Sequence, residues 1–114
     1  MNKTKYNRYS VYNNAVKNVK MFKLGFTNYE LLCIANALQF NIQYSKMYKF
    51  IAKNLCYNFS NFLSPIVLNS YQVDGLKDCI ENYLKKFKIG DSVEKTLIKI
   101  KNNLINIIES SNGI

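Results

Sequence analysis

The apolar residues of the C-terminal segment recur in steps of four and three, and this spacing constrains the chain to helical packing. They are Val93, Leu97, Ile100, Leu104 and Ile107. Such a seam lies along one side of a helix that packs lengthwise on another helix at a shallow angle. Ile98, Ile105 and Ile108 widen the apolar surface, so we expect a helix over about 92–109 that is either central in a bundle or in contact with a second chain.

Capping signals divide the rest of the chain into further helices. Thr27 and Glu30 form a capping box, in which each side chain bonds the backbone N–H of the other residue, and Asp91 and Glu94 form a second. Pro65 ends a helix before it, because the residue preceding a proline disfavours helical geometry. The predicted helices cover about 11–24, 28–43, 46–63, 70–88 and 92–109.

Helical periodicity also predicts the buried residues. The expected core comprises Leu38, Phe50, Ile51, Leu55, Ile80, Leu84, Leu97 and Leu104. The run 66–68 is either a buried extended linker or a turn of helix, and no strand alternation of useful length appears. We therefore predict one all-α domain over 1–114, a compact bundle of four to five helices with short loops, preceded by a loose basic segment over 1–9.

Residue types that are missing or sparse narrow the chemistry. The sequence has no His, which is the commonest metal ligand and the commonest acid–base group. Cys33, Cys56 and Cys79 lack the spacing of a zinc site, so we interpret them as inert thiols buried in helices. We expect no enzymatic activity, no metal site and no cofactor.

The net charge of +9 is concentrated in the first part of the chain. Before Asp74 the only acidic residue is Glu30, and three lysines form a ridge on the third predicted helix. Cations interleaved with tyrosines are typical of surfaces that neutralise phosphates and stack on bases. The predicted partner-binding residues are Lys3, Lys5, Arg8, Tyr9, Lys17, Lys20, Lys23, Lys46, Lys49 and Lys53.

Abundant Asn, Lys, Ile and Tyr indicate an AT-rich genome, such as that of a phage, plasmid or virus. Our leading hypothesis is a cytoplasmic accessory protein, an inhibitor or regulator of anti-defence type, that binds a nucleic acid or a nucleic-acid-handling protein. One alternative is an immunity-type protein of the kind that protects against bacteriocins, acting at the inner membrane surface. Another is an assembly subunit that self-associates through the last helix by Ile98, Ile105 and Ile108.

Overall fold

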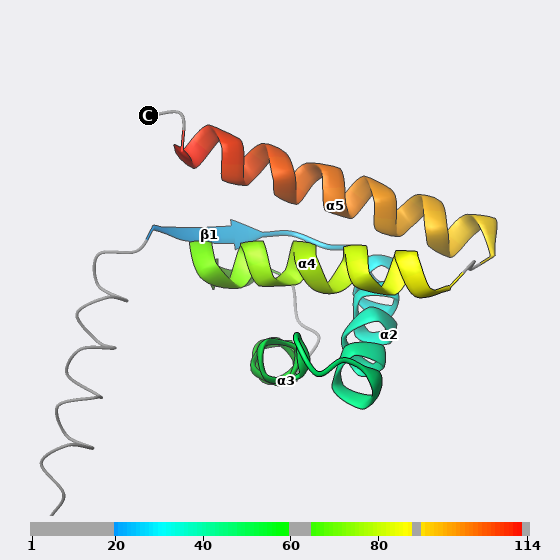
Figure 1. Cartoon of the computed structure of the whole chain (residues 1–114). Coiled ribbons are helices and arrows are strands. Elements are labelled where there is room, and N and C mark those ends of the chain that lie inside the picture. Colours follow the sequence, from blue (N-terminus) through cyan, green and yellow to red (C-terminus); the bar gives the residue numbers. More distant parts are fainter. Residues whose placement is uncertain (1–19, 60–64, 88–89, 113–114) are drawn as a thin grey trace, which may run out of the picture.

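The computed structural model describes residues 20–59, 65–87 and 90–112 (Figure 1). The described elements are strand β1 (Met21–Leu24), helix α2 (Asn28–Tyr44), helix α3 (Lys49–Asn58), strand β2 (Ile66–Asn69), helix α4 (Ser70–Lys86) and helix α5 (Asp91–Asn112). The predicted helical bundle is confirmed, with a small two-stranded sheet added to it.

Helix α4 is the centre of the bundle. It contacts α2, α3, α5 and β2, and α5 runs antiparallel along it (Figure 1). The lengthwise packing predicted from the seam of α5 is therefore observed. Its partner α4 takes the central position, and α5 covers α4 and α2 from one side.

The predicted helix over 11–24 is wrong at its C-terminal end, where Met21–Leu24 forms a strand; residues 11–19 lie outside the described ranges. This strand pairs antiparallel with β2, with Phe22 opposite Leu68 and Leu24 opposite Ile66. Burial alternates along it, because Phe22 and Leu24 face inward while Met21 and Lys23 are exposed. The sequence allowed the run 66–68 to be either extended or helical, and in the structure it is extended. This conformation suits its β-branched residues.

Side-chain caps fix the starts of two helices, and the one at α2 is the predicted capping box of Thr27 and Glu30. The Glu30 N–H donates to Thr27 Oγ1 at 3.1 Å, and the Thr27 N–H donates to Glu30 Oε1 at 2.8 Å. A second reciprocal pair joins Asn69 and Gln72 at the start of α4, with distances of 2.8 and 3.0 Å. These bonds satisfy backbone N–H groups that the first turn of a helix leaves without partners.

Helix α3 is shorter than the predicted helix over 46–63. Residues 46–48 form a turn in which the Tyr48 N–H donates to Ser45 Oγ at 3.0 Å, and 60–64 lie outside the described part. The expected burial of Phe50 is wrong, because its side chain is 78% exposed. Ala52 and Leu55 face the core, and at 100° per residue Phe50 lies about 200° around the helix from Ala52.

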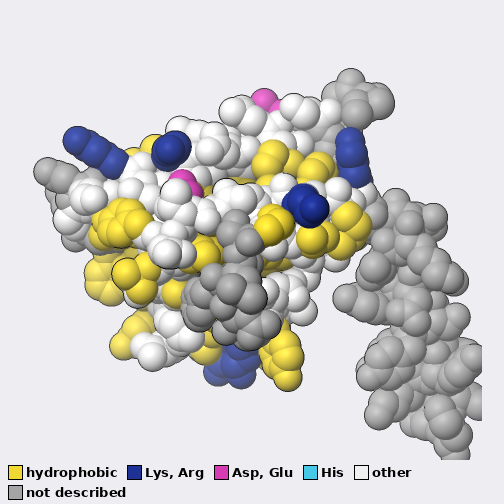
Figure 2. All heavy atoms as spheres, turned by 180° about the vertical axis from the view of Figure 1, so that it is seen from behind, with side chains coloured by type: hydrophobic (Ala, Val, Ile, Leu, Met, Phe, Trp, Pro, Cys, Tyr) yellow, Lys and Arg dark blue, Asp and Glu magenta, His cyan; other side chains and the backbone are white. Residues whose placement is uncertain are grey.

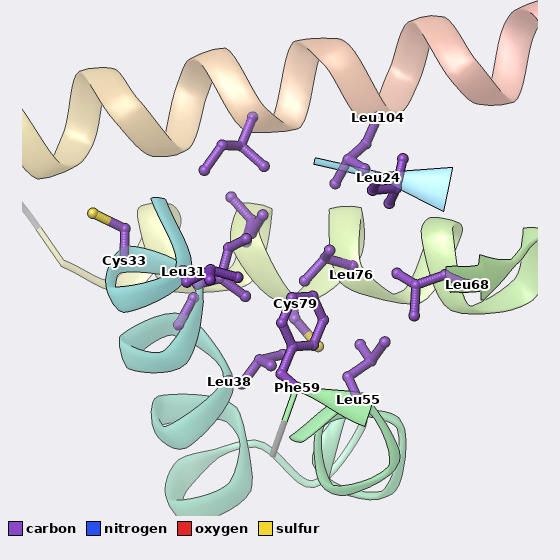
Figure 3. Packing of buried hydrophobic residues seen from close by; sticks show 14 of the residues in the cluster. Leu24, Leu31, Cys33, Leu38, Leu55, Phe59, Leu68, Leu76, Cys79 and Leu104 are labelled. Carbon is purple, nitrogen blue, oxygen red and sulfur yellow. The ribbon is translucent and has the colours of Figure 1, made fainter. Parts of the chain in front are cut away.

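Side chains from all six elements meet in one core (Figure 3). Of the predicted core, five residues are buried: Leu38, Leu55, Ile80, Leu97 and Leu104. Ile51 and Leu84 are half-buried and pack against the same cluster. Phe59 points into the centre of the core beside Leu38, Leu55 and Cys79 (Figure 3), and it is 2% exposed.

A glycine allows α3 and α4 to approach closely. A Cβ atom at Gly75 would lie 2.5 Å from Cγ1 of Ile51, a distance that real Cβ contacts do not reach. The Ile51 side chain therefore occupies space that a larger residue at position 75 would need, so packing across this contact depends on the absence of a side chain there.

One polar side chain lies inside the core. Asn41 is fully buried, and its Nδ2 donates to the carbonyl oxygens of Ala37 at 2.7 Å and Cys79 at 2.9 Å. Its Oδ1 accepts from Asn82 Nδ2 at 2.9 Å. The network joins α2 to α4 and gives both Nδ2 and Oδ1 of Asn41 hydrogen-bond partners, which a buried polar group requires.

Replacing Leu97 by Ala is expected to lower the free energy of unfolding by about 2–5 kcal/mol, as for other large-to-small changes in a well-packed core. The side chain of Leu97 is fully buried between α5 and its neighbours, whereas that of Ile98 is 38% exposed. Urea unfolding followed by circular dichroism measures the change, and Ile98→Ala is the matched control, with a smaller loss. Equal losses for the two variants would contradict the observed orientation of α5.

Candidate nucleic-acid interface

The outward side of α3 and the turn before it carry lysines and large apolar side chains together. We call this surface the lysine–aromatic face. It consists of Lys46, Met47, Lys49, Phe50, Lys53 and Tyr57, all of which are exposed. Because Phe50, Lys53 and Tyr57 are three and four residues apart, they follow one another along a single side of the helix.

No ion pair neutralises the lysines of this face within the described residues. The sequence holds no acidic residue between Glu30 and Asp74, so α3 and most of α2 lack carboxylates. The described ion pairs lie on α4, where Asp74, Asp78 and Glu81 surround Lys77 at 2.8–3.6 Å. Hydrogen bonding to Asp78 raises the pKa of Lys77 above its ordinary value. The carboxylates of α4 therefore pair with a lysine on their own helix.

A shallow groove of about 410 Å³ borders the lysine–aromatic face between α2 and α3. Its described lining is Ile42, Lys53, Cys56 and Tyr57, so it is apolar with one cation at its rim. Figure 2, which views the molecule from behind, shows lysines beside hydrophobic side chains on the surface. A flat apolar ring can therefore lie next to Tyr57 within reach of a lysine.

The structure divides the predicted basic residues among several places. Lys46, Lys49 and Lys53 come together on the lysine–aromatic face. Lys20 and Lys23 are exposed at β1, where the Lys20 ammonium lies 5.8 Å from the centre of the Phe22 ring. Lys20 and Phe22 border a second groove, of about 260 Å³, with the end of α5. The remaining predicted residues lie outside the described ranges: Lys3, Lys5, Arg8, Tyr9 and Lys17.

The isoleucines proposed as an apolar interface differ in how far they are buried. Ile108 packs against the core cluster and Ile105 is half-buried. Ile98 has the most exposed side chain of the three. The apolar surface that α5 leaves uncovered is therefore narrower than its sequence indicates.

Four aromatic rings at the C-terminal ends of α2 and α4 form a cluster that the sequence analysis missed. Phe40, Tyr44, Tyr83 and Phe87 contact one another with ring-centre distances of 5.0–5.6 Å. Tyr44 and Phe87 are largely exposed but stack within this cluster. The spacing of four between Phe40 and Tyr44, and again between Tyr83 and Phe87, was the available signal, but their meeting depends on how α2 packs on α4.

The cysteine interpretation holds for two of the three thiols. Cys33 and Cys79 are buried, while Cys56 is half-buried at the groove. Burial raises the pKa of all three thiols, that of Cys79 to about 12. A thiol with a raised pKa stays protonated at neutral pH and is a poor nucleophile and metal ligand.

The fold and this surface together define a small helical bundle with a cationic, aromatic side on one short helix. Over the ranges 20–59, 65–87 and 90–112, no three metal-ligating side chains gather, and no helix has the length and apolar character needed to cross a membrane. Nothing among models of known protein families, curated proteins and solved structures matches the chain.

Proposed function

We propose that the chain is a small, non-enzymatic accessory protein that binds a nucleic acid through its lysine–aromatic face. The observation that carries the proposal is the set of exposed lysines on an acid-free helix and the turn before it, which have no ion pair within the described residues: Lys46, Lys49 and Lys53. Phosphate groups are the biological anions that such a row of ammonium groups neutralises with release of counterions. The abundant AT-codon residues support an origin in a mobile element, where the protein would act in the cytoplasm of the host cell.

The nucleic acid is preferred over an acidic protein surface because of the exposed rings among the lysines. Bases offer flat surfaces on which Phe50 and Tyr57 can stack, and the lysines beside these rings can meet the phosphates. The alternatives receive less support. The immunity-type function depends on a first helix of which 11–19 lie outside the described ranges and 21–24 form a strand. Self-association through α5 depends on Ile98, Ile105 and Ile108, of which Ile108 packs against the core cluster and Ile105 is half-buried.

Salt dependence tests the proposal. We expect the affinity of the full chain for a labelled oligonucleotide to fall steeply with salt. If about four phosphates are contacted, the slope of log K against log salt concentration is near −3 for a single strand. Fluorescence anisotropy between about 50 and 200 mM salt measures the slope. Failure to bind any oligonucleotide at low salt would refute the proposal and favour a protein partner.

A further inference from the structure

Among the residues that the structure describes, the two rings of the lysine–aromatic face have no aromatic partner. Phe50 is 78% exposed and Tyr57 is 84% exposed, and within the described ranges neither ring stacks on another. By contrast, the ring of Phe59 is held by Phe26 and by the core. Turning an aromatic side chain to water forgoes the stabilisation that its burial would give. Two such rings on one helix side point to a binding surface.

The positions of the rings relative to the lysines define what can be bound. Phe50 and Tyr57 are seven residues apart, so they lie on the same side of α3 at a separation of about 10 Å along the axis. Lys53 lies one turn from each ring, and Lys49 directly precedes Phe50. A cation thus lies beside each ring. Rings and cations alternate along this side of the helix, as bases and phosphates alternate along a nucleic-acid strand.

This alternation distinguishes a single strand from a duplex. In a duplex the base faces are covered by their neighbours, so exposed rings on a protein helix have nothing to stack on. In a single strand each base offers an aromatic face, and stacking tolerates any base sequence. Lysines contact phosphates as point charges without the two-pronged geometry that arginine uses to read base edges. The face therefore suits a single strand bound with little sequence preference.

We infer that the lysine–aromatic face binds single-stranded nucleic acid, with bases stacked on Phe50 and Tyr57 and phosphates contacted by Lys46, Lys49 and Lys53. This inference rests on the proposed function and names its substrate class. The apolar groove beside Tyr57, lined by Ile42 and Cys56, gives a base stacked there a second apolar contact.

The test compares single and double strands on the full chain. Labelled 12-nucleotide dT and U oligomers are titrated by fluorescence anisotropy beside a duplex of the same length. We expect both single strands, or one of them, to bind more than tenfold more tightly than the duplex; a difference between dT and U would show whether the strand is DNA or RNA. Equal or tighter binding of the duplex overturns the inference.

Ring variants complete the test. Phe50→Ala and Tyr57→Ala are each expected to weaken single-strand binding by about 5- to 150-fold, the range measured for loss of one stacked base. Phe50→Trp keeps the stacking surface and retains binding. Tyr71→Ala removes a ring that is 71% exposed on α4 and serves as the matched control, with unchanged affinity. Thermal unfolding of every variant stays close to that of the wild type, because these side chains contribute little to the core.

The outcomes separate the inference from the proposed function. Binding that survives both alanine substitutions but falls steeply with salt would leave the proposed function in place and refute the stacking of bases. Absence of binding to every oligonucleotide would refute both. Loss of single-strand binding in the ring variants with an intact fold would support both.

Discussion

Replacing Lys46, Lys49 and Lys53 by Glu is expected to weaken oligonucleotide binding at 0.1 M salt by at least about a hundredfold. Each phosphate contact on a single strand contributes roughly 0.7 logarithmic units at this salt concentration, so three lost contacts give about two units. The introduced carboxylates add repulsion of the phosphates. Fluorescence anisotropy measures the loss. Circular dichroism should show unchanged helicity, because exposed charges contribute little to folding.

A matched variant separates position from net charge. Lys86, Lys95 and Lys99 are also exposed, on α4 and α5, and their replacement by Glu lowers the net charge from +9 to +3, as the first variant does. We expect this control to weaken binding less than tenfold, compared with about a hundredfold for the variant of Lys46, Lys49 and Lys53. Equal losses would mean that the overall field attracts the nucleic acid and that α3 is not its binding site.

Asn41→Asp is expected to destabilise this fold strongly at neutral pH. The carboxylate would face the carbonyl oxygens of Ala37 and Cys79, to which the amide now donates, inside a fully buried site. An uncompensated buried charge costs about 3–5 kcal/mol. Typical domains have a free energy of unfolding of only 5–15 kcal/mol, so the variant would be marginally folded at pH 7.

Burial determines how the stability of the Asn41→Asp variant depends on pH. The pKa of the introduced carboxyl is raised in the folded state, whereas in the unfolded chain it stays near 3.9. Below that value the group is protonated in both states and the charge penalty is absent. The penalty grows as the pH rises through the unfolded pKa towards the folded one. Urea unfolding at pH 3.5 and pH 7 should therefore show a loss relative to the wild type that is smaller at the lower pH.

Asn36→Asp is the control for this change, because Asn36 lies on the same helix with an exposed side chain. It is expected to alter the free energy of unfolding by less than about 0.5 kcal/mol, as is usual for surface positions. A comparable loss at positions 36 and 41, or no pH dependence at position 41, would contradict the buried network between α2 and α4.

Codon composition accounts for the number of lysines and asparagines but not for their placement. Six described lysines stand on the last two helices, and one of them, Lys77, is surrounded by carboxylates. The three lysines of α3 have no such partners and share their surface with Phe50 and Tyr57. A bias towards AT-rich codons acts on all positions alike, so it explains the number of lysines and not the gathering of lysines and exposed rings on one surface.

Three of the predicted helices agree closely with the structure because their signals are local. The capping box of Thr27 and Glu30 involves residues three apart, and it marks the start of α2 wherever the helix finally packs. The periodic seam of α5 likewise predicted both the helix and its buried side. The acid-free stretch around the lysines of α3 is also a property of the sequence alone.

The remaining features depend on contacts between residues far apart in the chain. Met21–Leu24 becomes a strand because it pairs with Ile66–Asn69, a partner that no local pattern identifies. The outward orientation of Phe50 was decided by the burial of Ala52 and Leu55 in the core, since a short helix with apolar residues on several sides has no single inward side of its own. Asn41 can be buried only because Cys79 and Asn82 meet it from α4. Local sequence thus determined where helices form, and tertiary packing decided which of their faces reach solvent, because burial is a property of the assembled chain.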